Sequence, residues 1–414
     1  MSHSPFQPTE QSLVADERTY RRLSINYTRN QAQDQTDNID AAARDFDFEA
    51  CKDQYWNPER FSLLWGTPLW EQSSSTQKVR LNQLYWVAYY CQIISAEIAT
   101  IFFNQTAAAG LYALDDFRLV CDTLDLESAQ ERAHINAFKT IAEKVEDELF
   151  GERLFTYPMR SPYVETMLYR NAGRAERFWR KLQLRAYALL SSGNAFIGCQ
   201  YFTVRGMRTL NGKLVQHQLS QYYSSHPEQA RCPLPSKVSY YHFLDESFHF
   251  NSSTIIGKEV VGTLKRPTAF ERQVVNQTLA GCQRDHFNFS TTINGIFWYD
   301  PALFPTIYRL LRSPVFGMTD GEARHQLLAC YGQETAGAEA SFQTHQTALN
   351  SYKAYLADLS YVDAGNRDLK VMGRSSYERH LEVNRRAIRA FAKNWRDEPR
   401  AKAVERLAAA EAFA

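Results

Sequence analysis

Two glutamate–histidine pairs with identical spacing lie far apart in this 414-residue chain. Glu131 precedes His134 by three residues, and Glu246 precedes His249 by three residues. If each segment is helical, this spacing places the carboxylate and the imidazole on one helix face. Carboxylate oxygen and imidazole nitrogen are donors that hold transition metals such as iron and manganese. One such unit is common on a solvated helix face, but two of them predict a metal site.

Two further side chains extend this set of donors. His242 lies four residues before Glu246, on the same face of the expected helix. Glu97 stands alone in the apolar stretch IISAEIATIFF. A buried carboxylate is costly without a cation, which a metal or a structural ion pair would supply. The predicted ligands of two metal ions are Glu97, Glu131, His134, His242, Glu246 and His249.

Four long segments with helical patterns must position these ligands. We expect these core helices near residues 78–109, 124–149, 163–206 and 238–256. The first is apolar nearly all round but carries scattered Gln, Ser, Glu, Thr and Asn, which predicts a buried core helix rather than a membrane span. Ferritin-like dimetal bundles use one Glu from each of two helices and Glu-x-x-His from each of the other two. We therefore predict an all-α fold, a ferritin-like four-helix core with additional packed helices.

The third of these segments lacks the expected carboxylate. No acidic residue lies between positions 186 and 204, and Asn194 occupies the expected depth beside Ser191, Ser192 and Gly193. We predict that Asn194 is the catalytic residue standing where a fourth carboxylate is usual, with Gln200 as the second choice. The alternative is that Asn194 only hydrogen-bonds a neighbouring helix. Asn211-Gly212 and three prolines predict a loop of about thirty residues after this segment.

The chain divides by composition into three parts. Residues 1–55 form a polar arm that wraps the body or is mobile, 56–365 the catalytic domain, and 366–414 a charged C-terminal helix. With 47 basic and 46 acidic residues, no overall field recruits nucleic acid or an anionic membrane. Seven cysteines without a Cys-x-x-Cys pair argue against a disulfide scaffold. Because the N-terminus also lacks an apolar secretory segment, we expect a cytoplasmic protein.

The order and spacing of the six ligands, over roughly residues 78–255, resemble the ferritin-like p-aminobenzoate N-oxygenases, which also carry an extra histidine one turn before the last Glu-x-x-His. The neutral Asn194 and the amino-acid sequence of residues 85–138 are more similar to the cyanobacterial CylC-like dimetal halogenases. That resemblance implies two iron ions, with manganese as the other choice, and a dioxygen-dependent enzyme that halogenates a fatty acyl chain. It also implies an acyl carrier protein, an external electron donor and chloride as co-substrate. By analogy, a neutral Asn194 leaves room for the halide.

Two other functions fit the same residues. An N-oxygenase or hydroxylase would use the same ligands. Whether Asn194 ligates a metal would distinguish such an enzyme from a halogenase. A metal-binding helical protein without turnover would lack a cavity that reaches the ligands. Oligomerisation as a homodimer is also left open.

Two surface and core features bear on the substrate. Residues 160–185 carry seven basic and two acidic side chains, which suits either an acidic carrier protein or a solvated helix face. An aromatic run is expected either to line an acyl channel, together with His286, or to pack in the core. Its members are Phe287, Phe289, Phe297, Trp298 and Tyr299.

Overall fold

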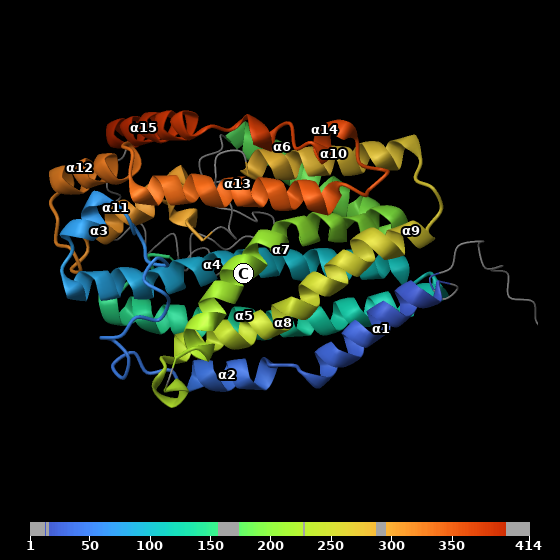
Figure 1. Cartoon of the computed structure of the whole chain (residues 1–414), viewed down its shortest axis with the longest axis horizontal. Helices are drawn as coiled ribbons and strands as arrows, with labels where there is room; N and C mark the ends of the chain where they lie inside the picture. The colour runs from blue at the N-terminus through green and yellow to red at the C-terminus, as the bar shows by residue number, and fades with distance from the viewer. Residues whose placement is uncertain (1–12, 14–15, 156–173, 227, 287–294, 395–414) are drawn as a thin grey trace, which may run out of the picture.

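A computed structural model of the chain describes residues 13, 16–155, 174–226, 228–286 and 295–394. Every regular element in this part is helical and none is a strand, which confirms the all-α prediction (Figure 1). The α-helices are α1 (Glu17–Ala32), α2 (Thr36–Arg44), α3 (Pro68–Gln72), α4 (Ser75–Leu111), α5 (Arg118–Phe150), α6 (Arg174–Ser192), α7 (Ala195–Ser224), α8 (Leu234–Thr254), α9 (Val261–Thr263), α10 (Ala269–His286), α11 (Phe304–Arg312), α12 (Asp320–Tyr331), α13 (Ala336–Leu356), α14 (Ala364–Arg367) and α15 (Tyr377–Asn394).

Four helices form a bundle at the centre of the molecule. α4 packs on α5, α5 on α8, α8 on α7, and α7 back on α4. In Figure 1, α1 and α2 lie along one side of this bundle, and α10, α13 and α15 lie on the opposite side. Both α1 and α2 contact α5 or α8, so the described part of the N-terminal arm packs against the body. The ferritin-like character of the bundle stays a prediction.

The ends of the bundle helices follow local sequence signals. Ser74 and Gln77 form a reciprocal capping box that starts α4. Gly151 ends α5 with φ at 63°, a left-handed conformation that glycine adopts without steric cost. α8 continues into a π-helical turn, Ile255–Val260. A Cβ on Gly257 in this turn would lie 2.4 Å from the backbone nitrogen of Thr203, so glycine allows the close approach to α7.

The third predicted helix and the loop after it differ from the expectation. The chain breaks at Gly193-Asn194, where α6 ends and α7 begins, and residues 163–173 lie outside the described part. α7 then continues to Ser224, through the Asn211-Gly212 dipeptide that predicted a turn. Beyond that dipeptide, Val215 and Leu219 are buried in the core. Burial of these side chains outweighs the cost of about 1 kcal/mol for glycine inside a helix.

A buried polar layer separates two apolar clusters. The first cluster includes Trp86, Phe138 and Trp298, and the second includes Phe103 and Phe202, each together with other buried side chains. α4 contributes residues up to 94 to the first cluster and residues from 103 onward to the second. α5 and α8, the latter with its π-helical turn, also reach both clusters, and the predicted ligands lie between them.

The aromatic run 297–299 belongs to the first cluster. Phe297, Trp298 and Tyr299 are buried, and the ring of Phe297 contacts Tyr85 and Tyr89 of α4. Of the two alternatives, core packing is therefore correct for this part of the run, and the earlier part lies outside the described residues.

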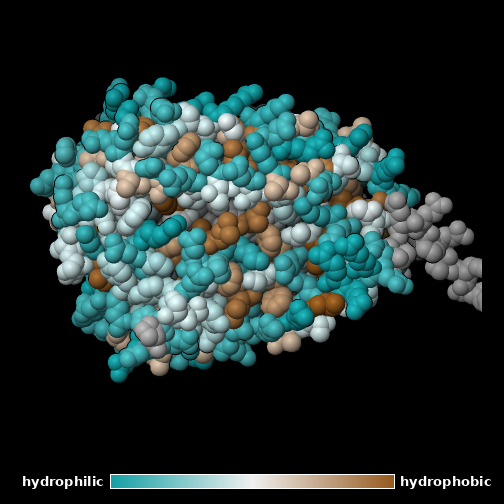
Figure 2. Space-filling view, in the orientation of Figure 1, coloured by the Kyte–Doolittle hydropathy of each residue, from teal (hydrophilic) through white to brown (hydrophobic). Residues whose placement is uncertain are grey.

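By length and composition alone, α4 is the one helix in the described part that could cross a membrane. However, 72% of its most apolar window is buried inside the protein, as predicted for a core helix. The face drawn in Figure 2 is mostly hydrophilic, with small apolar groups scattered over it.

Candidate metal centre

The structure brings all six predicted ligands together in the polar layer. Glu97 comes from α4, Glu131 and His134 come from α5, and the other three come from α8. They form two overlapping groups whose donor atoms lie within 4.8 Å of one another. The first group is Glu97, His134, His242 and Glu246, and the second is Glu131, Glu246 and His249.

Two carboxylates face both groups. Glu246 Oε1 lies 2.9 Å from His249 Nδ1 and 3.7 Å from His242 Nε2. Glu131 places one oxygen 3.4 Å from His249 Nδ1 and the other 3.5 Å from His134 Nδ1. Glu97 Oε1 completes the first group, 3.2 Å from His242 Nε2. Carboxylates that face two donor sets suit a pair of ions rather than a single one.

Polar neighbours orient two of the imidazoles. His134 Nε2 lies 3.1 Å from Asp245 Oδ2, and the other oxygen of Asp245 accepts the backbone N–H of Gln35. His249 Nε2 lies 2.9 Å from Gln130 Oε1. With a proton on each Nε2, bonded to these acceptors, each Nδ1 would present its lone pair to a metal in the ligand groups.

The six ligands fit metal ions because several of their buried polar atoms have no hydrogen-bond partner. Among the described residues, both oxygens of Glu97, one of Glu131, Nδ1 of His134 and both nitrogens of His242 are buried without a hydrogen-bond partner. Buried polar atoms are almost always paired, and so many orphans in one place indicate an absent ligand. All of them are oxygen or imidazole nitrogen, the donors that iron and manganese accept.

The charge of the layer supports the same conclusion. Among the described residues of the layer, Arg205 of α7 is the buried guanidinium, and it contacts Glu127 and Glu131. Three further carboxylates lie in the layer, those of Glu97, Asp245 and Glu246. The layer thus holds five carboxylates and one guanidinium, and bound metal cations would supply balancing positive charge.

Burial and neighbouring charges shift the pKa values of the ligands. Burial raises the pKa of Glu97 well above its usual range. Burial would also raise the pKa of Glu131, but the nearby His249 and His134 lower it below its usual range. Burial, followed by the charge of His134, lowers the pKa of His242 to about 3. His242 is therefore neutral near pH 7, the form in which imidazole binds a metal.

A small cavity of about 50 Å³ adjoins the ligands on the side of α7. Glu97, Glu131, His242 and Glu246 form part of its wall. The rest of the wall is Ile93, Ala96, Thr100, Arg205, Thr209, Gly212, Lys213, Gln216 and Phe250. Small molecules therefore have space beside the ligands.

Comparison with known families agrees with this geometry. A family model described as "Acyl halogenase CylC-like" matches residues 18–392, nearly the whole chain. The chain belongs to the CylC-like acyl halogenase family. No curated protein and no solved structure matches it. The resemblance to CylC-like halogenases is thus confirmed, while the one to p-aminobenzoate N-oxygenases stays a prediction.

In this CylC-like chain, Asn194 does not lie at the ligands. Its side-chain oxygen caps α7 by accepting the N–H of Ile197, and its Nδ2 donates to Glu271 over 2.6 Å. It precedes Arg205, the α7 residue that touches the ligands, by eleven residues, or roughly 16 Å along the helix. The expectation for Asn194 is wrong because α7 begins there. Gln200 instead bonds Tyr361.

The residue that α7 does present is Arg205. Its Nη1 donates to Glu127 Oε2 over 2.5 Å, and its Nη2 donates to Glu131 Oε1 over 3.3 Å. The hydroxyl of Ser252 donates to the other oxygen of Glu127. A neutral residue was expected next to the ligands on this helix. The chain instead places the guanidinium of Arg205 there.

Sequence reasoning missed four polar residues of the layer, Glu127, Gln130, Arg205 and Asp245. One signal for Glu127 was present: it precedes Glu131 by four residues, as His242 precedes Glu246. Gln130 and Asp245 likewise precede His134 and His249 by four residues, whereas no comparable spacing marks Arg205.

Proposed function

We propose that this chain is a dioxygen-dependent dimetal halogenase, holding two iron ions, that replaces a hydrogen on an unactivated carbon of a fatty acyl chain. The observation that carries this proposal is the pair of overlapping ligand groups that share Glu246, found in a member of an acyl halogenase family. When bound, the metal ions supply the oxidising chemistry that a carbon–hydrogen bond requires, and the protein supplies position, charge and exclusion of water.

Side chains of α4, α5 and α8 would hold the two metal ions next to each other. Glu131 and Glu246 face both groups and would contribute to holding both ions. Asp245 and Gln130 fix the imidazoles of His134 and His249, as outer hydrogen bonds do in metal sites. The apolar clusters on either side of the layer limit the access of water.

Arg205 provides positive charge for a halide. The second ligand group has three members against four in the first, and Arg205 contacts its member Glu131. Arg205 also lines the small cavity beside the ligands, with Lys213 on the same wall. A small anion in this cavity would face a buried guanidinium, whose hydrogen bonds to anions are strong. We therefore assign the halide, chloride or bromide, to the small cavity beside Arg205 and not to the position of Asn194.

The balance of the reaction requires further reactants. Replacing hydrogen by halogen with dioxygen as oxidant consumes one halide, three protons and two electrons for each carbon, and it releases two waters. An external electron donor must supply those electrons. We propose an acyl carrier protein as the bearer of the chain, because Lys181 and Arg185 are exposed on α6 for an acidic partner. The seven cysteines are all buried and none forms a disulfide, which agrees with the reducing cytoplasm proposed for this protein.

The test is halogen transfer by iron-loaded protein. Saturated acyl pantetheine thioesters would be incubated with the protein, a chemical reductant, dioxygen, and either chloride or bromide, and the products analysed by mass spectrometry. We expect the halogen in the product to follow the salt, and Glu246→Gln to abolish turnover. Products that carry added oxygen and no halogen with either salt would favour a hydroxylase or N-oxygenase instead.

A further inference from the structure

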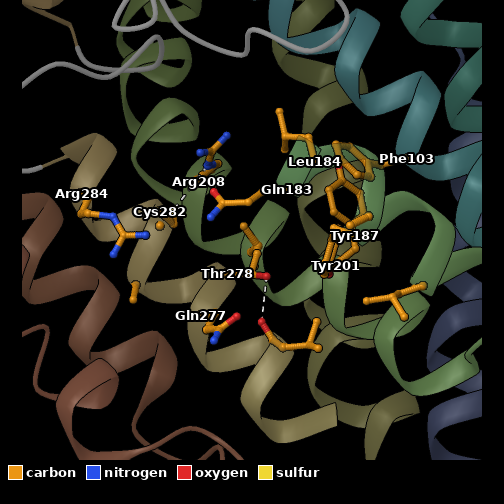
Figure 3. A pocket seen from close by; sticks show the side chains of 16 residues that line it. Phe103, Gln183, Leu184, Tyr187, Tyr201, Arg208, Gln277, Thr278, Cys282 and Arg284 are labelled. Atoms are coloured by element: carbon orange, nitrogen blue, oxygen red, sulfur yellow. Dashed lines mark hydrogen bonds between the residues drawn. The ribbon is translucent and has the colours of Figure 1, made fainter. Parts of the chain in front are cut away.

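A second, larger cavity lies outside the metal centre, between α4, α6, α7 and α10 (Figure 3). Its volume is about 450 Å³, within the usual range for sites that bind small organic molecules. Most of its wall is apolar, including Phe103, Leu184, Tyr187, Tyr201, Val204 and Val274. The family match and the metal centre do not by themselves assign a ligand to this space.

The cavity is apolar at one end and basic at the other. In Figure 3, Phe103, Tyr187 and Tyr201 lie together on one side, and Arg208 and Arg284 lie on the opposite side. The rings of Phe103 and Tyr201 stack with centroids 4.6 Å apart. A ligand with an apolar chain and a polar head matches this distribution.

The aromatic end adjoins the metal centre. Tyr201 lies four residues before Arg205 on α7, a rise of roughly 6 Å, and Phe103 lies six residues after Glu97 on α4, roughly 9 Å. Thr100, which lines the small cavity beside the metal ligands, hydrogen-bonds Tyr201. Tyr201, on the wall of the larger cavity, therefore lies next to a residue on the wall of the smaller one.

We propose that this larger cavity binds the acyl chain of the substrate, with the chain against the aromatic end and the polar head toward Arg208 and Arg284. The later fate of the chain rests on the proposed function, but binding in the cavity does not require the metals. Each methylene transferred from water into such a space strengthens binding about fourfold.

Gly281 of α10 offers a way to fill the cavity without disturbing the helix. It lines the cavity, and a Cβ built on it would meet only the end of the Arg284 side chain, at 3.7 Å. Gly281→Phe should therefore occupy the space needed by the chain. Gly321 on α12 is a matched control, because a Cβ there has no neighbour within 4 Å and the residue does not line the cavity.

The experiment is calorimetric titration of metal-free protein with acyl pantetheine thioesters from acetyl to dodecanoyl. We expect affinity to rise with chain length in the unmodified protein and in Gly321→Phe. Gly281→Phe should bind the long chains at least tenfold more weakly and acetyl about equally. If Gly281→Phe fails to fold by circular dichroism, Thr278→Phe, at another position on the wall, takes its place.

Affinity that does not depend on chain length, or long-chain binding unchanged by the filling variant, would overturn the assignment of this cavity. Failure of the proposed function is a separate result: long chains bind as expected, yet iron-loaded protein forms no halogenated product.

Discussion

Asp245 Oδ2 lies 3.1 Å from His134 Nε2, and neither residue exposes any surface. This contact turns His134 Nδ1 toward Glu97 and Glu131, each 3.5 Å away. The N-terminal arm contributes, because the backbone N–H of Gln35 holds the other oxygen of Asp245. The arm thus helps to orient a candidate ligand.

Asp245→Asn should weaken metal binding about 10- to 100-fold, since an amide in this position orients and polarises the imidazole less well than a carboxylate. Competition with a coloured chelator under anaerobic conditions would measure the change. Asp358→Asn is the control, because Asp358 is exposed on the surface. Equal metal affinity in Asp245→Asn and the unmodified protein would show that Asp245 has no role in ligation.

Arg205→Gln should lower the free energy of unfolding of the metal-free protein by about 3–5 kcal/mol, because Glu127 and Glu131 would be left buried without their cation. Adding Glu127→Gln removes one of those charges and should restore much of the loss. Urea unfolding of the single and double variants would give both values. A double variant as unstable as the single one would argue that Arg205 acts through packing alone.

The same double variant tests the proposed halide site. With both metals bound, replacing Arg205 should raise the chloride concentration for half-maximal halogenation about 10- to 100-fold, the loss expected for a hydrogen bond to a charged group. The readout is product formation over a chloride series, with metal content measured in parallel. An unchanged chloride dependence at full metal occupancy would place the halide elsewhere.

Gly257→Ala should destabilise the protein by about 1–3 kcal/mol, because its Cβ would meet the backbone nitrogen of Thr203 at 2.4 Å and α7 would have to move. Gly262→Ala, one turn later in a position with no neighbour within 4 Å, should be neutral or stabilising by up to about 1 kcal/mol. Thermal unfolding compares the two variants directly. Similar melting temperatures would mean that α7 and the π-helical turn separate at little cost.

Residues on a single helix were predictable because helix geometry alone sets which of them share a face. The pair Glu131 and His134 and the series ending at His249 needed only their spacing. Glu97 was predictable from its apolar surroundings, since a carboxylate there requires a cation.

Residues whose role depends on packing between helices were not predictable. Which side chain of α7 faces the ligands depends on where α7 begins, and the break at Gly193-Asn194 moved that point by several turns relative to the expectation. Arg205 therefore took the place assigned to Asn194. Asp245 and Gln130 each precede one predicted ligand by one residue and another by four, so spacing places them near ligands of their own helix but does not say what they bond. They reach imidazoles of the facing helix instead.

The metal content of anaerobically purified protein reconstituted with ferrous iron tests the central claim most directly. Unmodified protein should bind two ions per chain, His242→Ala should lose occupancy of one, and Glu246→Ala should weaken both because Glu246 belongs to both groups. Circular dichroism would confirm that each variant keeps its helices. A ratio of one ion or none in the unmodified protein, or two ions fully retained in Glu246→Ala, would contradict a dimetal centre built on these residues.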